Sequence, residues 1–295
     1  MAKLTIVVNC TERKSQTPNP QLQARSLPQD SVEKRVRQWR RRVDEAVPSS
    51  TLIDLYQGEA WQQVRGLAHD AVNLGFKVRL LVASAGLGLR DANSKGPAYA
   101  ATFAGGHPDT VTPPGLASQV WWKALEKFGD SDSLIETAGD RVLLVLSENY
   151  ARAMHSDLEE LAARGGDLLL VGGAKTVEGL PRLPADMGLR RQVGGTASSI
   201  TLRIARLWLA RRTSNDVYHP NDARRWSNWA ASVSQLERYD RRPASDSELR
   251  ALIVRLKETD PSLSATRALR SLRDAGIACE QKRFGELFRT TGASR

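Results

Sequence analysis

Four short apolar runs, each ending in small and polar residues, constrain the fold of this 295-residue chain more than any other feature. They are apolar at nearly every position and span residues 4–8, 78–82, 142–146 and 168–171. Runs of this kind, bounded by turn residues, are typical of strands buried on both faces of a parallel sheet. Segments with helical periodicity separate them, which predicts a series of βαβ units. We therefore expect a doubly wound α/β/α fold around a four-stranded parallel sheet, whose strand ends converge on one ligand site.

The pattern also divides the chain. The α/β series closes with an apolar helical segment at 194–212, so we expect a first domain at 1–212 and a polar linker or extension at 213–245. Residues 246–295 predict three short helices, with Ser264 as an N-cap and Gly276 after the second helix. The short turn at Gly276 resembles a helix-turn-helix connection, which would place Lys282 and Arg283 of the last helix in a DNA groove. A protein-interaction module is the alternative.

The net charge of +10 lies entirely in the last third of the chain. Residues 190–295 hold 21 Lys and Arg against 11 Asp and Glu, whereas residues 1–189 hold 22 of each. This asymmetry favours a polyanionic partner, which we expect to be double-stranded DNA. A predicted helix at 31–47 carries a second basic cluster that includes Arg40, Arg41 and Arg42, and Lys14 is a further candidate for a phosphate contact. A solvated, arginine-rich surface explains the same residues without DNA.

The composition and the motifs of the sequence exclude several classes of protein. Two cysteines and four scattered histidines make neither a disulfide framework nor a zinc motif, so we expect no metal and no other cofactor. The segment from Ser84 to Gly88 is not a nucleotide-triphosphate loop. No run reaches the roughly 18 apolar residues of a membrane helix, and the first residues do not resemble a signal peptide. The sequence therefore predicts a cytoplasmic protein with no membrane partner.

Candidate site residues follow the apolar runs. Asn9 can hold a water or read a base edge, while Cys10 beside it is also typical of a small buried residue at a strand end. Asp54 is either a helix cap or a functional carboxylate. Glu148 follows the third run, and His155 lies in the helix predicted at 150–163, where a structural role is the alternative to catalysis.

Five motifs, in this order, resemble a bacterial family of uracil-DNA-glycosylase-like domains related to domains attached to transglycosylases that modify guanine derivatives. The resemblance covers about residues 1–212, and one relative in the family is an anti-phage DNA glycosylase that acts on glucosylated hydroxymethylcytosine. The motifs are Asn9-Cys10-Thr11 with Lys14, Asp54-Leu55-Tyr56, Ser84-Ala85-Gly86-Leu87-Gly88-Leu89, the stretch 97–103, and Val145-Leu146-Ser147 with Tyr150. Better-known uracil-DNA glycosylases carry catalytic Asp and His motifs where this chain has Asn9-Cys10-Thr11 and Gly172-Gly173-Ala174.

The resemblance implies that a modified base is flipped into a pocket and cut from its sugar, leaving an abasic site, in anti-phage defence. For that chemistry we expect Asp54 to stabilise positive charge on the sugar, Asn9 to position the water, and His155 or Glu148 to assist the departing base. The residues expected to surround the base are Cys10, Tyr56, Ser84, Gly86, Gly88, Tyr99, Phe103, Ser147 and Asn149. A non-catalytic DNA-binding regulator that senses a ligand and a base-exchange transglycosylase remain alternatives.

Overall fold

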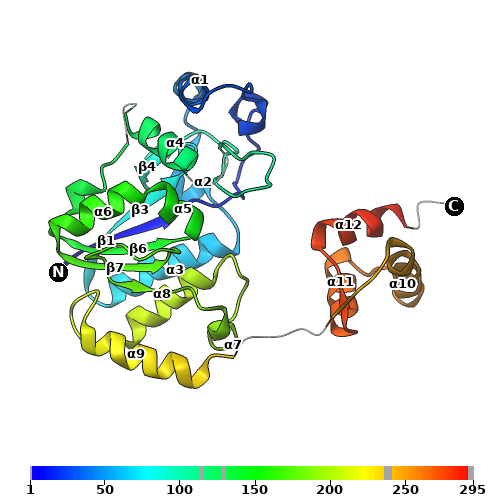
Figure 1. The fold of residues 1–295 in the computed structure, drawn as a ribbon. Coiled ribbons are helices and arrows are strands. Elements are labelled where there is room, and N and C mark those ends of the chain that lie inside the picture. Colours follow the sequence, from blue (N-terminus) through cyan, green and yellow to red (C-terminus); the bar gives the residue numbers. More distant parts are fainter. Residues whose placement is uncertain (1, 113–115, 128–130, 236–240, 292–295) are drawn as a thin grey trace. The chain divides into compact units, whose positions relative to one another are not determined.

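The computed structural model describes residues 2–112, 116–127, 131–235 and 241–291 (Figure 1). It forms two compact units, Met1–Gln235 and Leu236–Arg295. Each unit has its own cluster of buried apolar side chains, so each is described by itself.

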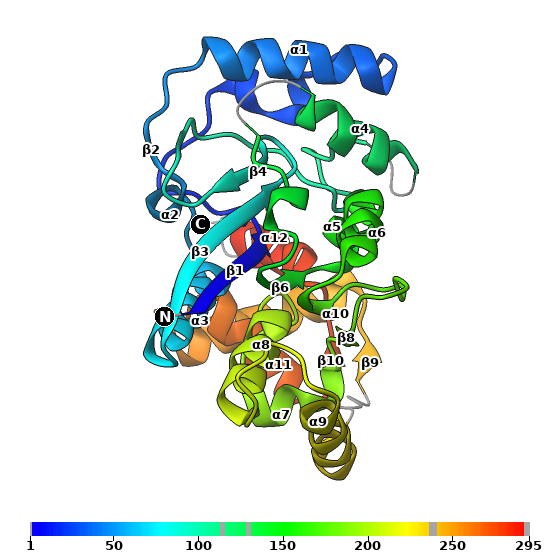
Figure 2. The same ribbon diagram turned by 90° about the vertical axis from the view of Figure 1, so that its left-hand side faces the viewer.

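The first unit is built around a six-stranded sheet with the order β4-β3-β1-β6-β7-β8. The four predicted strands are its parallel centre: β1 (Ala2–Asn9), β3 (Phe76–Ser84), β6 (Arg141–Leu146) and β7 (Asp167–Gly172). Figure 2 shows β1 and β3 running side by side. The expectation of four strands is corrected by two edge strands, β4 (Gly88–Asp91), antiparallel to β3, and β8 (Arg182–Leu183), parallel to β7.

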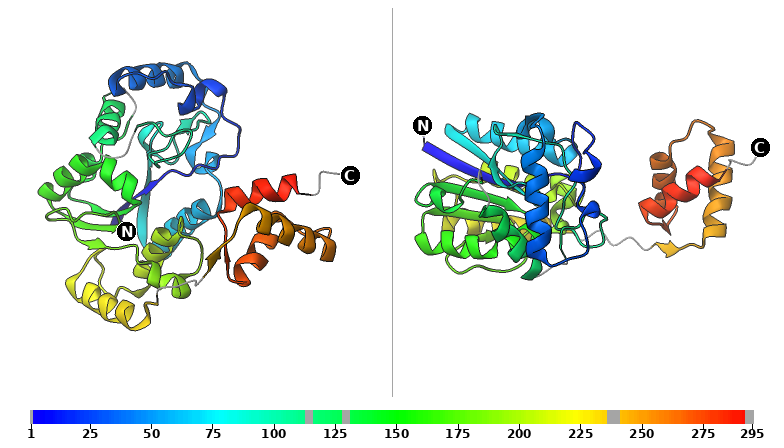
Figure 3. Two further views of the ribbon diagram at one scale, coloured as in Figure 1. Left: turned by 45° about the vertical axis from the view of Figure 1, so that its right-hand side comes forward. Right: turned by 90° about the horizontal axis from the view of Figure 1, so that it is seen from above.

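Helices cover both faces of this sheet (Figure 3). On one face, α3 (Glu59–Asn73) and α8 (Ile200–Arg211) pack together, and α3 buries Trp61, Val64, Leu67 and Ala71 at helical spacing. The helices α4 (Leu116–Glu126), α5 (Glu148–Ala153) and α6 (His155–Arg164) form the other layer, and α1 (Val32–Glu45) packs on α4. The doubly wound α/β architecture is therefore present in the structure.

Short elements complete the first unit. A single helix was expected at 150–163, but the chain leaves helical geometry at Met154, which separates α5 from α6. The helix expected at 194–212 begins only at Ile200. The remaining elements are η1 (Pro20–Leu22), η2 (Ala24–Ser26), β2 (Ser50–Thr51), α2 (Leu52–Leu55), β5 (Lys95–Gly96), η3 (Ile135–Thr137), η4 (Met187–Leu189) and α7 (Arg190–Val193).

The first unit continues past residue 212, because a further helix packs on it. Helix α9 (Pro220–Val233) lies within the segment expected to be a linker or extension. Its Trp226 ring lies 5.7 Å from the ring of Trp208 in α8, centroid to centroid, in an edge-on arrangement. Buried Asp222 accepts hydrogen bonds from the backbone N–H groups of Thr213 and Ser214, which fixes the turn into α9.

The second unit has the three expected helices, α10 (Asp246–Thr259), α11 (Ala265–Asp274) and α12 (Gln281–Thr290). Ser264 caps α11 by accepting the N–H of Arg267, and Gly276 after it has a φ of +76°. Two short strands, β9 (Arg242–Pro243) and β10 (Ile277–Ala278), pair in parallel. The buried side chains at the centre include Leu249, Ile253, Leu269 and Phe284.

Candidate functional site

The strand order places a ligand crevice between β1 and β6. The chain continues from β1 to β3 on one side, and β6 pairs with β1 on the other side. The carboxyl ends of two such strands form a topological switch point, where open α/β sheets bind ligands. A pocket of about 190 Å³ lies there, which we call the central pocket. It is lined by Asn9, Cys10, Glu12, Ala101, Thr102, Ala104, His107, Ser147, Asn149 and Tyr150.

Two asparagines line the central pocket, and they differ in their side-chain hydrogen bonds. The Oδ1 of Asn9 accepts the backbone N–H of Ser147 at 3.0 Å, and its Nδ2 donates to the carbonyl of Cys10 at 3.3 Å. Asn9 therefore ties the end of β1 to the end of β6. Asn149 makes no side-chain hydrogen bond within the described part of the chain, so its amide is available to a ligand.

A carboxylate and an imidazole meet at the edge of the central pocket. The Nε2 of His107 lies 3.0 Å from Oε1 of Glu12, and its Nδ1 accepts the backbone N–H of Asp109 at 3.0 Å. Because Nδ1 accepts, the proton of the neutral ring sits on Nε2 and is donated to Glu12. The Glu12 side chain is 80% exposed, so it remains open to solvent and ligand.

Asp109 anchors the loop that carries His107. Its side chain is only 2% exposed and accepts hydrogen bonds from the backbone N–H and the guanidinium of Arg25, at 3.1 Å and 2.8 Å. Burial acts to raise the pKa of Asp109, but the hydrogen bonds and charge of Arg25 hold that pKa below its usual value. The carboxylate stays ionised and fixes the His107 loop to residue 25.

Beneath the central pocket, hydroxyl groups form a buried network. The Sγ of Cys10 lies 3.1 Å from the hydroxyl of Tyr150, and the hydroxyl of Tyr99 lies 2.7 Å from that of Tyr56 and 2.5 Å from Oγ of Ser84. Burial raises the pKa of all three tyrosines, so they stay protonated. Tyr56, Ser84 and Tyr99 are packed in the core rather than lining the pocket.

The other residues expected to contact a base also have structural roles in the packing of the core or in the backbone conformation. Phe103 is buried against the Tyr150 ring, at 5.2 Å between centroids. A Cβ added at Gly86 would lie 2.5 Å from Cδ2 of Tyr99, so only glycine fits beneath that ring. Gly88 has a φ of +73° and begins β4. Of the nine expected base-contact residues, only Cys10, Ser147 and Asn149 line the central pocket.

Asp54 does not lie beside Asn9, which corrects the expected catalytic pair. It sits in α2, whose Leu52 and Leu55 are buried and leave Asp54 on the outer side with 69% of its side chain exposed. Its carboxylate accepts from Oγ1 of Thr51 at 2.7 Å and lies 3.5 Å from Arg65. These contacts tie Asp54 to the residue before α2 and to α3, and not to the central pocket.

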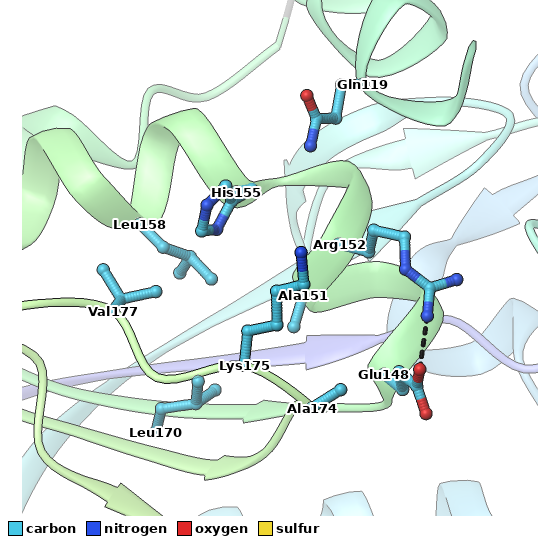
Figure 4. Close-up of a pocket in the computed structure, with 10 residues that line it drawn as sticks. All are labelled: Gln119, Glu148, Ala151, Arg152, His155, Leu158, Leu170, Ala174, Lys175 and Val177. Atoms are coloured by element: carbon cyan, nitrogen blue, oxygen red, sulfur yellow. Dashed lines mark hydrogen bonds and ion pairs between the residues drawn. The ribbon is translucent and has the colours of Figure 1, made fainter. Parts of the chain in front are cut away.

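His155 and Glu148 line a second hollow, which we call the lateral pocket (Figure 4). It has a volume of about 90 Å³. Glu148 pairs with Arg152 one helical turn along, and Nε2 of His155 lies 3.3 Å from Oε1 of Glu159. The expected catalytic residues Asn9, Asp54 and His155 therefore occupy three separate places. The lining residues are Gln119, Glu148, Ala151, Arg152, His155, Leu158, Leu170, Ala174, Lys175 and Val177.

Lys14 points into the protein. Its ammonium lies 4.2 Å from the centroid of the Tyr99 ring and donates to the carbonyls of Thr11 and Glu12, each at 3.2 Å. Burial lowers the pKa of Lys14. These contacts shape the loop that presents Glu12 and occupy the group that we expected to meet a phosphate.

Most of the other predicted DNA contacts have protein partners. Arg40 pairs with Asp44 at 2.8 Å, and Arg42 donates to the carbonyl of Gln21 at 2.9 Å. Arg41 is exposed. Arg283 donates to Asp246 at 2.8 Å and to the carbonyl of Ala244 at 3.0 Å, which ties α12 to the start of α10. The side chain of Lys282 lies outside the described part of the structure.

Sequence reasoning did not single out Glu12 or His107 for the site. Glu12 follows the first apolar run by a few residues, and His107 lies in the described segment 97–112, which contains no helix and no named strand. Loops of that length in a compact domain are usually functional, and this was the available signal. Nothing in the sequence pairs two residues that lie 95 positions apart.

Two searches of the described residues are negative. No group of three or more His, Cys, Asp or Glu side chains in this part of the chain is placed to hold a metal ion. None of the described helices is both long enough and apolar enough to cross a bilayer.

Comparison with protein-family models, with curated proteins and with solved structures finds no match to this chain.

Proposed function

We propose that the first unit is a DNA N-glycosylase that hydrolyses the bond between a base and its deoxyribose in the central pocket. The observation that carries this proposal is the hydrogen-bonded pair of Glu12 and His107 at the switch point of the sheet. The motif resemblance described above supports the same reaction class. It also makes a modified base, such as glucosylated hydroxymethylcytosine, the first substrate to test, with anti-phage defence as the biological setting.

The chemistry needs a carboxylate close to the sugar. As the bond between C1′ and the base nitrogen breaks, its electron pair leaves with the base and the sugar gains oxocarbenium character. The carboxylate of Glu12 stabilises that charge and accepts a proton from the attacking water, whose oxygen forms the new bond to C1′. The departing base takes up a proton from solvent. His107 orients Glu12 through its Nε2 proton, and the products are an abasic site and a free base.

The rest of the pocket suits a flipped base. Asn149 offers two donors and one acceptor, which match the edge of any base that presents a donor beside an acceptor. The hydroxyl of Ser147 lines the same pocket, and Tyr150 supplies an aromatic surface. Flipping costs a few kcal/mol, which stacking and edge hydrogen bonds offset. The net positive charge of the chain favours a DNA partner.

The test measures abasic sites with an aldehyde-reactive probe. The full chain is incubated with unmodified DNA and with phage DNA that carries glucosylated hydroxymethylcytosine. Glu12→Gln removes the proton acceptor and should lower the cleavage rate by about 10²–10⁴-fold. Glu136→Gln, an exposed glutamate in η3, is the matched control and should leave the rate unchanged. The absence of abasic sites on both DNAs, or a Glu12→Gln enzyme as fast as wild type, would refute the proposal.

A further inference from the structure

The lateral pocket is a positively charged hollow that the proposed reaction does not use. Arg152, His155 and Lys175 line it, together with Gln119. Figure 4 shows the Lys175 side chain reaching across the hollow toward α5. Glu148 is the one carboxylate among the ten lining residues, and it pairs with Arg152. Lys175 has no ion pair or hydrogen bond within the described residues, so its ammonium is available to a ligand.

The floor of the lateral pocket is apolar. Leu158, Leu170 and Val177 are all buried, and they lie beneath the charged side chains. Such a floor cannot hydrate an anion on its inner side, and it strengthens the electrostatic interaction with the cations at the rim. An anion that carries carbon substituents, such as a phosphate ester, therefore fits better than a bare inorganic ion.

Helix α5 and its N-cap Ser147 contribute lining residues to both pockets. Ser147, Asn149 and Tyr150 line the central pocket, whereas Glu148, Ala151 and Arg152 line the lateral one. A helix with its side chains is about 10–12 Å across. A nucleic-acid strand carries one phosphate per about 3.4 Å of its axis, so α5 corresponds to about three nucleotide steps.

We propose that the lateral pocket binds a backbone phosphate of the strand whose base occupies the central pocket. Lys175 supplies the free positive charge, Arg152 adds a second cation, and Gln119 adds a hydrogen-bond donor. The phosphate belongs to a nucleotide a few steps from the flipped base. The identity of the strand rests on the proposed function, but the binding of a phosphate ester does not.

The experiment measures binding of a fluorescently labelled, unmodified DNA duplex to the full chain at several salt concentrations. Lys175→Gln should weaken binding by about 3–10-fold and reduce the slope of log K against log salt by about one. Lys77→Gln is the matched control, because Lys77 is an exposed lysine at the amino end of β3, away from the strand ends. It should bind like wild type. Glu148→Gln should bind about 2–3-fold more tightly, since it removes the competing carboxylate, and a misfolded variant would not show that gain.

A second arm uses thymidine 5′-monophosphate and follows the backbone amide signals of Ala151 and Ala174. Shifts that depend on Lys175, together with the weaker duplex binding of Lys175→Gln, support the proposal. Lys175-dependent binding of the mononucleotide alone would overturn the assignment to a strand and indicate a free nucleotide. Equal duplex binding by Lys175→Gln and Lys77→Gln would overturn it as well. If wild type binds in this way but forms no abasic sites, the glycosylase proposal fails and the phosphate site stands.

Discussion

At the scale of single residues, the candidate site depends on how Asp109 is held. This buried carboxylate binds Arg25 with its side chain, while its backbone N–H fixes the tautomer of His107. Leaving a buried polar partner unsatisfied costs about 1–3 kcal/mol. Asp109 thus both stabilises the loop that carries His107 and orients the Glu12–His107 pair.

Asp109→Asn should lower the free energy of unfolding by about 1–3 kcal/mol at pH 7, because the guanidinium of Arg25 loses its ionic partner. Since the pKa of Asp109 is lowered in the folded state, the stabilisation is present above its ordinary pKa and is lost as pH falls through the lowered value. Urea unfolding of both proteins from pH 7 down to acid should therefore show the difference shrinking. Asp44→Asn removes an exposed ion pair and should change stability by less than about 1 kcal/mol. A constant difference at all pH values would contradict this account.

A second titrating residue lies in α4. Burial, with Asp157 beside it, raises the pKa of Glu126 to about 7. A raised carboxyl pKa means that the folded state holds the proton more tightly, so stability is lost as pH rises from the ordinary value through about 7. Glu126→Gln cannot ionise and should reduce that loss by roughly 1–3 kcal/mol, since one pKa unit corresponds to about 1.4 kcal/mol. Unfolding in urea at pH 5 and pH 8 measures the effect. Parallel losses in the variant and wild type would contradict it.

At the scale of elements, long strands with a continuous apolar pattern can be predicted from the sequence, whereas short edge strands and breaks within helices cannot. The four parallel strands follow from continuous apolar runs, but β4 and β8 do not, because Arg90, Asp91 and Arg182 interrupt any such pattern at the sheet edges. The break between α5 and α6 at Met154 leaves no mark in an apolar periodicity that continues on both sides. The placement of Asp54 likewise depends on which residues of α2 are buried, which tertiary packing decides.

The end of β7 offers a test of element packing. Gly172 has a φ of +98°, and an added Cβ would lie 2.2 Å from the carbonyl oxygen of Leu146 in β6. Gly172→Ala should therefore destabilise the protein by more than about 2 kcal/mol, through the backbone conformation and the clash together. Gly139, at a φ of +86°, has nothing within 4 Å of such a Cβ, so Gly139→Ala should cost only about 1–2 kcal/mol. Equal urea midpoints for the two variants would show that the clash is relieved.

At the scale of the whole molecule, the positive charge is divided between the two units: residues 1–235 carry 30 Lys and Arg against 24 Asp and Glu, and residues 236–295 carry 13 against 9. The two units have independent apolar cores, and the second contains only about as many residues as the smallest domains that fold alone. In the described part of the second unit, Arg283 forms an ion pair with Asp246, and Arg242 forms one with Glu248. Arg255 has no carboxylate partner there. Several of its cations therefore stabilise the unit itself, and only the remainder are available to a polyanion.

A chain that ends at Gln235 separates these roles. The described residues of the first unit form their own cluster of buried apolar side chains, so the shortened protein should unfold cooperatively with a midpoint within a few degrees of the corresponding transition in the full chain. Residues 236–295 carry 13 Lys and Arg against 9 Asp and Glu, so their removal should weaken binding to a DNA duplex and flatten its salt dependence. Calorimetry and fluorescence anisotropy measure the two effects. If the shortened chain binds duplex DNA as tightly and with the same salt slope as the full chain, the second unit is not a nucleic-acid contact, and the first unit alone must supply the affinity.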